Sequence, residues 1–209
     1  MSNARCIRVL SIDDHPLVRE GIGTIINSQS DMSLDGTASN GKEGIEAFRA
    51  LSPDVTLMDL HLPDLSGIDV MNAIRSEFPD ARVIVLTTFD GDIHVRRALK
   101  AGARGYLLKS MPARQMVDMI RQVHAGRKCV PTEIATRLAE HLGDEALSRR
   151  EMEVLQQVAA GRRNRDIAAR LFIAEETVKV HVKNIRDKLG ASDRTQAVTI
   201  AARRGIIAI

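Results

Sequence analysis

The first 125 residues repeat one pattern five times, a short apolar run followed by a longer segment with helical periodicity. Because each helix must return the chain before the next strand begins, five such units predict a parallel sheet with helices on both faces. The expected fold class is therefore α/β, with a doubly wound five-stranded parallel sheet. The apolar runs predict strands at 7–12, 33–38, 55–58, 83–87 and 105–108. The periodic segments predict helices at 16–28, 41–51, 66–77, 91–101 and 112–125.

The pattern changes after residue 126. Residues 127–146 contain one predicted helix, at 133–142, and we interpret them as a linker. Beyond the linker only helical patterns occur, at 148–160, 164–171, 175–189 and 194–204. Ser148 and Glu151 have the spacing of a capping box, and glycines 161 and 190 are predicted to end helices. We expect one domain at 1–126 and a second, all-α domain of four helices at 147–209.

The composition limits the class of protein. The chain is 44% hydrophobic but only 2% aromatic and lacks Trp, so aliphatic cores are expected. Residues 145–209 carry 13 Lys and Arg against 8 Asp and Glu, whereas the preceding residues carry 17 against 19. This basic second part suggests a polyanionic partner. No apolar run is long enough to cross a membrane, and the start "MSNARCIRVL" lacks the features of a signal peptide, so we expect a cytoplasmic protein without a membrane partner. Cys6 and Cys129 are interpreted as free thiols.

Carboxylate, hydroxyl and amine side chains stand at the ends of four of the predicted strands. They are Asp13 and Asp14 after the first strand, Asp59 after the third, Thr87 at the end of the fourth and Lys109 after the fifth. The carboxyl ends of parallel strands share one edge of a sheet, where ligands bind in open α/β folds, so these five side chains are expected to converge.

Three neighbouring carboxylates need a cation to remain charged, and an all-oxygen ligand set suits Mg²⁺. An amine and a hydroxyl beside them are what a phosphoryl group requires. Asp59 is the expected nucleophile, so the predicted chemistry is phosphoryl transfer onto Asp59. A single Asp at a strand end is more often turn chemistry than a catalytic group. The joint spacing of "DD", "MDLHLP", Thr87 and Lys109 favours a functional site.

Through these motifs, residues 7 to about 125 resemble the receiver domain of a two-component response regulator, which has a flavodoxin-like fold. The resemblance implies that Asp14 binds the metal directly, that Asp13 acts mainly through water, and that the backbone carbonyl of His61 is a further ligand. It also implies phosphorylation of Asp59, with Thr87 and Lys109 gripping the phosphoryl group. Tyr106 matches the aromatic residue that turns inward when Thr87 moves toward the phosphate; on the residues alone, ordinary strand packing is the favoured interpretation.

The predicted helix at 175–189 has an apolar stripe and basic residues on its other side. The short turn "FIAEE" joins it to the preceding helix, which is the plan of a helix-turn-helix. Through "TVKVHVKNI" and "KLGASDRTQAV" this block resembles the LuxR-type helix-turn-helix of NarL/FixJ response regulators. The resemblance implies base contacts by Lys179, Val180 and Lys183 and phosphate contacts by Thr177, Asn164 and Arg194. It also implies that two copies of the chain form a dimer through the helix at 194–204.

The sequence therefore predicts a transcription regulator that is not an enzyme. Its expected partners are a sensor histidine kinase as phosphodonor, double-stranded DNA and, in the active form, a second copy of the chain. One alternative is a constitutive DNA-binding regulator that phosphorylation does not control. The other is a metal-dependent phosphatase, which would need an acid or base two residues after Asp59, where His61 stands.

Overall fold

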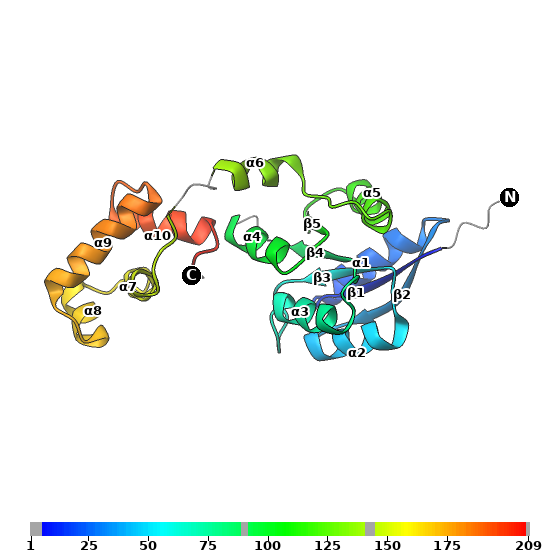
Figure 1. The fold of residues 1–209 in the computed structure, drawn as a ribbon, viewed down its shortest axis with the longest axis horizontal. Helices are drawn as coiled ribbons and strands as arrows, with labels where there is room; N and C mark the ends of the chain where they lie inside the picture. Colours follow the sequence, from blue (N-terminus) through cyan, green and yellow to red (C-terminus); the bar gives the residue numbers. More distant parts are fainter. Residues whose placement is uncertain (1–5, 89–91, 141–144, 208–209) are drawn as a thin grey trace. The chain divides into compact units, whose positions relative to one another are not determined.

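The computed structural model describes residues 6–88, 92–140 and 145–207 (Figure 1). The chain divides into two compact units, one built mainly from the residues up to Ala135 and the other mainly from those after it. The domain boundaries expected at residues 126 and 147 stay predictions. None of the helices in the described ranges combines the length and apolar character needed to cross a membrane.

The first unit contains a five-stranded sheet in which every pair of neighbouring strands is parallel. The strand order is β2-β1-β3-β4-β5, so the direction of winding reverses between β1 and β3. This confirms the predicted α/β fold class. The strands are β1 (Ile7–Ile12), β2 (Met32–Ala38), β3 (Val55–Asp59), β4 (Val83–Thr87) and β5 (Gly105–Leu108).

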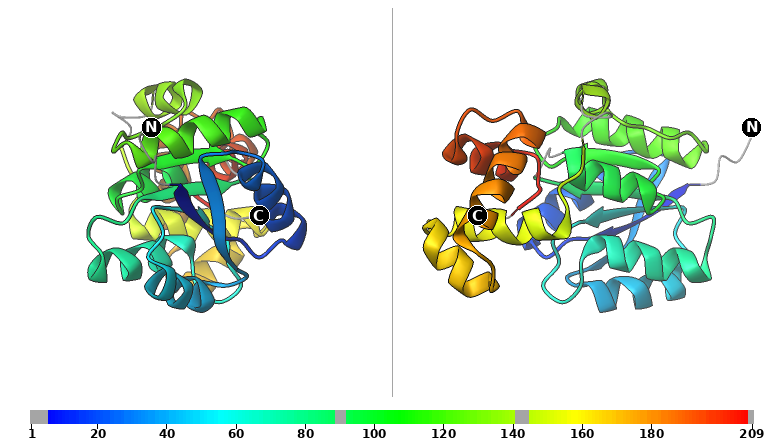
Figure 2. Two further views of the ribbon diagram at one scale, coloured as in Figure 1. Left: turned by 90° about the vertical axis from the view of Figure 1, so that its right-hand side faces the viewer. Right: turned by 60° about the vertical axis from the view of Figure 1, so that its left-hand side comes forward.

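Helices cover both faces of this sheet (Figures 1 and 2). Helices α1 (Pro16–Asn27) and α5 (Ala113–His124) pack together on one face. The other face is covered by α2 (Gly41–Leu51), α3 (Gly67–Glu77) and α4 (Asp92–Lys100). The predicted helices agree with these bounds to within one residue, and residue 91, at the start of one of them, lies outside the described residues.

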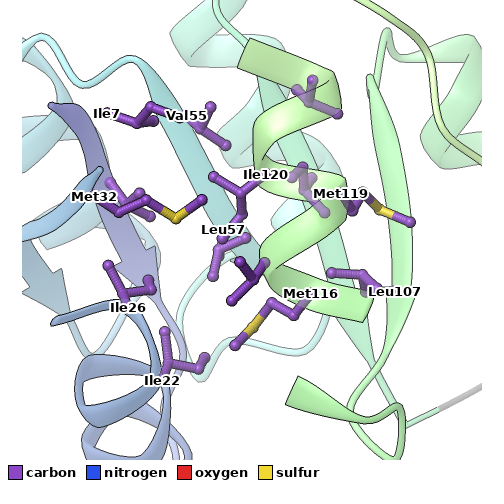
Figure 3. Packing of buried hydrophobic residues seen from close by; sticks show 14 of the residues in the cluster. Ile7, Ile22, Ile26, Met32, Val55, Leu57, Leu107, Met116, Met119 and Ile120 are labelled. Atoms are coloured by element: carbon purple, nitrogen blue, oxygen red, sulfur yellow. The ribbon is translucent and has the colours of Figure 1, made fainter. Parts of the chain in front are cut away.

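The core between the sheet and the α1–α5 layer is made of aliphatic and Met side chains, as the composition predicts (Figure 3). Leu57 and Val9 from the central strands and Ile120 from α5 are completely buried. The central strands need no polar face because helices cover both sides of the sheet. Packing of helices on both faces therefore fixes the positions of the strand ends.

Strand β2 contains a bulge. Val9 is opposite Leu34 and Leu10 is opposite Gly36, so Asp35 is an extra residue in the ladder. Its carboxylate lies 2.5 Å from Arg8 Nε on the neighbouring strand and accepts a hydrogen bond from Ser33. Those two interactions keep a charged residue at the edge of the sheet.

The second unit contains α7 (Arg149–Ala159), α8 (Asn164–Leu171), α9 (Glu175–Leu189) and α10 (Arg194–Arg203) around its own aliphatic core. The four predicted helices are confirmed to within one residue at each end. Along the chain, α6 (Thr132–Glu140) lies between α5 and α7, and its predicted continuation to residue 142 lies outside the described residues. Gly190 ends α9 in the left-handed conformation, as predicted.

The predicted capping box is present at the start of α7. Ser148 Oγ accepts from the backbone of Glu151, and the Glu151 carboxylate accepts from the backbone of Ser148 at 2.7 Å. The same buried carboxylate accepts from Lys188 Nζ at 3.0 Å, which ties α7 to α9. Burial by itself raises the pKa of Glu151, but the hydrogen bonds from Ser148 and Lys188 outweigh it and lower the pKa below the ordinary value.

The segment after α5 pairs with the edge of the sheet. Cys129 N donates to Arg104 O at 2.8 Å, and Tyr106 N donates to Cys129 O at 3.2 Å. The beginning of the predicted linker is therefore attached to β5 by backbone hydrogen bonds.

Candidate phosphoacceptor site and nucleic-acid interface

The strand ends of the first unit bring the predicted site residues to one edge of the sheet. Asp13 follows β1, Asp59 is the last residue of β3, and Thr87 is the last residue of β4. Lys109 follows β5, and its backbone N–H donates to Thr87 O at 2.8 Å. Since β1 and β3 are neighbours at the point where the winding reverses, their carboxylates meet in the crevice that this fold uses for ligands.

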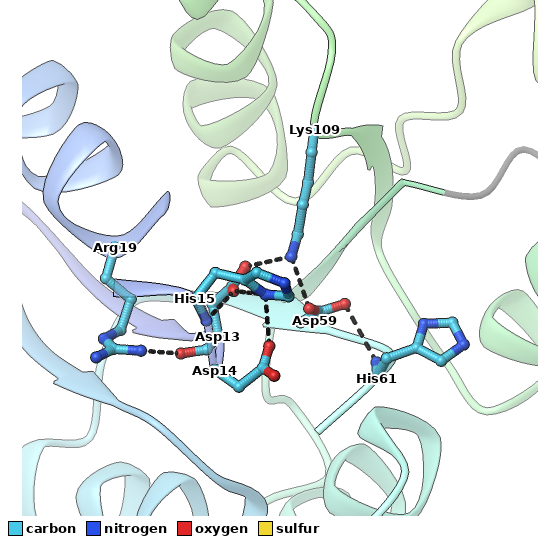
Figure 4. Close-up of polar contacts among 7 residues, drawn as sticks. All are labelled: Asp13, Asp14, His15, Arg19, Asp59, His61 and Lys109. Atoms are coloured by element: carbon cyan, nitrogen blue, oxygen red, sulfur yellow. Dashed lines mark hydrogen bonds and ion pairs between the residues drawn. The ribbon is translucent and has the colours of Figure 1, made fainter. Parts of the chain in front are cut away.

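Lys109 links two buried carboxylates (Figure 4). Its Nζ lies 2.6 Å from Asp59 Oδ2 and 2.7 Å from Asp13 Oδ2. The Asp13 side chain is 0% exposed and that of Asp59 is 4% exposed, so solvent does not screen these pairs. Burial favours the neutral amine, but the two carboxylates outweigh it and raise the pKa of Lys109.

Asp14 and His15 lie at the opening of this pocket. His15 Nδ1 lies 2.6 Å from Asp14 Oδ1 and 3.2 Å from Asp13 Oδ1. Donor atoms of Asp13, Asp14, His15 and Asp59 all lie within 4.8 Å of one another. His15 was missed by sequence reasoning, although it directly follows the acidic pair.

The pocket fits a hard divalent cation. Asp13 Oδ2 and Asp14 Oδ1 are buried, and Lys109 and His15 are their charged partners in this pocket. Carboxylate oxygens gathered in this way are the ligands that Mg²⁺ prefers. Asp59 Oδ1 accepts a hydrogen bond from His61 N at 3.1 Å, while the His61 side chain is exposed to solvent. The role of the His61 carbonyl as a metal ligand stays a prediction.

Thr87 and Tyr106 are both completely buried. Thr87 ends the strand next to β3, beside the pocket, and Tyr106 lies on β5, next to β4. This placement is compatible with coupled movement of the two side chains, but the role of Tyr106 as a switch stays a prediction.

Helix α9 in the second unit has the two faces expected of a recognition helix. Val178, Ile185 and Leu189 are buried against α7, α8 and α10. The opposite side exposes Thr177, Lys179, Val180 and Lys183. Val180 is 56% exposed, which leaves an aliphatic side chain between two lysines in water. A mixed basic and apolar surface of this kind suits the major groove, where it would meet base edges and thymine methyl groups.

The other predicted DNA contacts lie at the ends of neighbouring helices. Asn164 is the first residue of α8, and its Oδ1 is buried without a hydrogen-bond partner in the described structure. Arg194 begins α10 and donates to Arg162 O at 2.9 Å, so its guanidinium already helps to hold the α7–α8 loop. Contacts by either residue with phosphate stay predictions.

A receiver-like α/β unit with an acidic pocket, joined in one chain to a basic helix-turn-helix unit, defines the class of DNA-binding response regulators. Residues 9–121 match the response regulator receiver domain family, and residues 145–201 match the luxR family of bacterial regulatory proteins. The chain belongs to the response regulators of NarL/FixJ type.

Similar proteins cover nearly the whole chain. The transcriptional regulatory protein YxjL of Bacillus subtilis is 43% identical over 96% of this chain and 97% of its own length. The transcriptional regulatory protein LiaR of the same organism is 40% identical over 96% of this chain and 99% of its own. The crystal structure of ChrA, the response regulator of a heme-sensing two-component system, matches with a TM-score of 0.58 and 37% identity, covering 97% of this chain and 99% of that one. The order of receiver and DNA-binding domains is therefore shared along the full length.

Proposed function

We infer that this response regulator is phosphorylated on Asp59 by a sensor histidine kinase in the presence of Mg²⁺, and that it then acts as a sequence-specific transcription regulator in the cytoplasm. The observation that carries the inference is the position of Asp59, a buried carboxylate at a strand end held between Lys109 and the acidic pair. A buried carboxylate with a lysine and further carboxylate oxygens around it is suited to accept a phosphoryl group.

The proposed reaction is direct transfer. A carboxylate oxygen of Asp59 bonds to phosphorus while the bond from phosphorus to the imidazole nitrogen of the donor histidine breaks. Lys109 keeps a positive charge beside the carboxylate and the new phosphoryl oxygens. Asp13, Asp14, Asp59 and the His61 carbonyl would hold Mg²⁺, which, when bound, neutralises negative charge on the carboxylates and the phosphoryl group.

An apolar groove beside the pocket supports docking of the donor. The groove has a volume of about 210 Å³ and lies between α1 and α5, with Lys109 at its wall. Leu17, at the beginning of α1, lines it and is 82% exposed. A large exposed apolar side chain next to a reactive carboxylate is typical of a protein-binding surface, and a helix of the kinase fits that role.

The output of the switch is DNA binding. Phosphorylation adds about 1.5 to 2 negative charges to the pocket, which biases Thr87 and Tyr106 toward a second arrangement. We infer that the active form is a homodimer joined through α10, which presents two copies of α9 to two half-sites on double-stranded DNA.

Phosphotransfer with an Asn variant tests the assignment. Wild type, Asp59→Asn and Asp69→Asn are incubated with acetyl phosphate and Mg²⁺, and the phosphorylated fraction is measured by mass spectrometry. Asp69 is the matched control because it is an exposed carboxylate in α3. We expect phosphorylation of wild type and Asp69→Asn and none of Asp59→Asn. Phosphorylation of Asp59→Asn to the same level as wild type would falsify the assignment. Binding of a promoter fragment with and without acetyl phosphate then separates a phosphorylation-controlled regulator from a constitutive one.

A further inference from the structure

We propose that His15 is a nitrogen ligand of the acidic pocket, so that the pocket binds transition-metal ions such as Mn²⁺ through an imidazole as well as through carboxylates. The inference rests on the metal site of the proposed function and adds a ligand to it. It gives the site a selectivity that an all-oxygen set lacks.

The first argument is the position of the ring. Figure 4 shows the His15 imidazole beside the carboxylates of Asp13 and Asp14. Its Nδ1 is 2.6 Å from Asp14 Oδ1, and its backbone N–H donates to Asp13 Oδ1 at 2.9 Å. Pro16 follows as the first residue of α1 and restricts the backbone there. The ring is thus held at the mouth of the pocket, and its 63% exposure leaves an entry path for an ion.

The second argument is the spacing of the donor atoms. Two ligands about 2.1 Å from one ion are at most about 4.2 Å apart. The four donor atoms, including one from His15, lie within 4.8 Å of one another. Small side-chain rotations at Asp14 and His15, which are both partly exposed, close the difference.

The third argument is that His15 and Lys109 contact different carboxylate oxygens of Asp13. Lys109 is paired with Asp13 Oδ2, whereas His15 Nδ1 is next to Asp13 Oδ1. An ion on the His15 side therefore leaves the ion pairs of Lys109 in place. A purely structural ion pair between His15 and Asp14 would need no such arrangement around Asp13.

The chemistry of the donors then determines which ions use His15. Carboxylates suit both Mn²⁺ and Mg²⁺, and among first-row transition ions the affinity of a site rises from Mn²⁺ to Co²⁺. The imidazole is therefore expected to add affinity for a transition ion and little for Mg²⁺. We expect Mg²⁺ to bind through oxygens alone and Mn²⁺ to recruit the ring. Mn²⁺ is the better probe because Cys6 and Cys129 are free thiols that would bind Zn²⁺.

The test is pulsed electron paramagnetic resonance of Mn²⁺ bound to the full-length protein. We expect modulation from a directly bound imidazole nitrogen, and a change in its pattern when the histidines are labelled with ¹⁵N. His15→Gln abolishes the modulation, whereas His124→Gln, which removes an imidazole in the last turn of α5, retains it. Calorimetry is expected to show that His15→Gln weakens Mn²⁺ binding about tenfold and changes Mg²⁺ binding less than about twofold.

The outcomes separate this inference from the proposed function. If wild type binds Mg²⁺ and Mn²⁺ but shows no nitrogen modulation, or if the modulation survives in His15→Gln, the role of His15 is wrong and the proposed function stands. If neither ion binds, the metal site of the proposed function fails as well. If His15→Gln weakened the binding of Mg²⁺ and of Mn²⁺ by the same factor, the proposed selectivity would also be wrong, because an equal loss would indicate a general electrostatic effect.

Discussion

The close approach of α3 to the phosphoacceptor strand makes Gly67 a sensitive position. Gly67 is the first residue of α3, and its N–H donates to Leu60 O at 2.9 Å. A Cβ at this position would lie 2.0 Å from Asp59 O and 2.9 Å from both Asp59 C and Leu60 Cα. All three are backbone atoms, so no side chain can rotate away to relieve the overlap. The substitution Gly67→Ala must therefore displace either the start of α3 or the backbone of Asp59.

The expected loss of stability follows from two terms. Forcing an extra methyl into a packed region destabilises a protein by about 1 to 3 kcal/mol. Separation of Gly67 from Leu60 also weakens one hydrogen bond, which contributes about 1 kcal/mol. Ala recovers less than about 1 kcal/mol through its better helix propensity. We therefore expect Gly67→Ala to lower the free energy of unfolding of the first unit by about 2 to 3 kcal/mol.

Tyr106 supplies a selective probe for this measurement. It is the single tyrosine in a chain without Trp, and it is completely buried in the first unit. Urea unfolding followed by tyrosine fluorescence therefore reports on that unit alone. Gly21→Ala is the matched control, because a Cβ at this position in α1 meets nothing within 4 Å. The control is expected to gain about 0.5 to 1 kcal/mol. Equal stability of the two variants would refute the steric argument.

Three further predictions concern charged groups. Lys109→Ala leaves two buried carboxylates without their cation and should lower the free energy of unfolding by about 3 to 5 kcal/mol, with partial recovery in Mg²⁺; a loss below about 1 kcal/mol in urea unfolding would contradict this. The lowered pKa of Glu151 means that its carboxylate stabilises the second unit above its ordinary pKa of 4.5, and that this contribution disappears as the pH falls through the folded-state value. Hydrogen exchange in α7 should therefore separate Glu151→Gln from wild type at pH 7, and the difference should shrink as the pH falls through the folded-state pKa; a difference that stays constant into acid would exclude this cause. Lys183→Ala should weaken promoter binding with a salt-sensitive loss, measured by fluorescence anisotropy at several salt concentrations, and an unchanged affinity would remove Lys183 from the interface.

Most of the fold was predictable because its determinants are local. Buried parallel strands appear as short apolar runs, and α2, α3, α7 and α10 begin at Asn, Ser or Asp side chains that cap them. The edge strand β2 has the least strand-like sequence, since Asp35 and Gly36 interrupt it. The structure explains the interruption, because Asp35 is a bulge residue held by Arg8.

The candidate site was predictable only where a residue's position followed from its strand. Asp59 and Lys109 come directly at strand ends, so the parallel sheet alone brings them together. The direction of the His15 ring depends instead on how α1 begins, and the role of Gly67 depends on how closely α3 approaches β3. Neither feature has a periodic signal in the sequence, because both depend on the geometry of the loop between a strand and the helix that follows it.

Strand β5 connects the pocket to the segment that leads out of the first unit. Lys109, which follows β5, is paired with Asp59, and Tyr106 within β5 donates its backbone N–H to Cys129 O. A phosphoryl group on Asp59 would change the charge that Lys109 neutralises, so the end of β5, together with β3 itself, would respond directly to phosphorylation. A shift of β5 must then either carry Cys129 with it or break the two hydrogen bonds at 2.8 and 3.2 Å. Breaking both would leave two backbone groups of the sheet edge without partners, and each broken bond costs about 1 kcal/mol. We therefore expect the segment after α5 to move together with β5, which would connect the proposed phosphorylation site mechanically to the chain that precedes the DNA-binding unit.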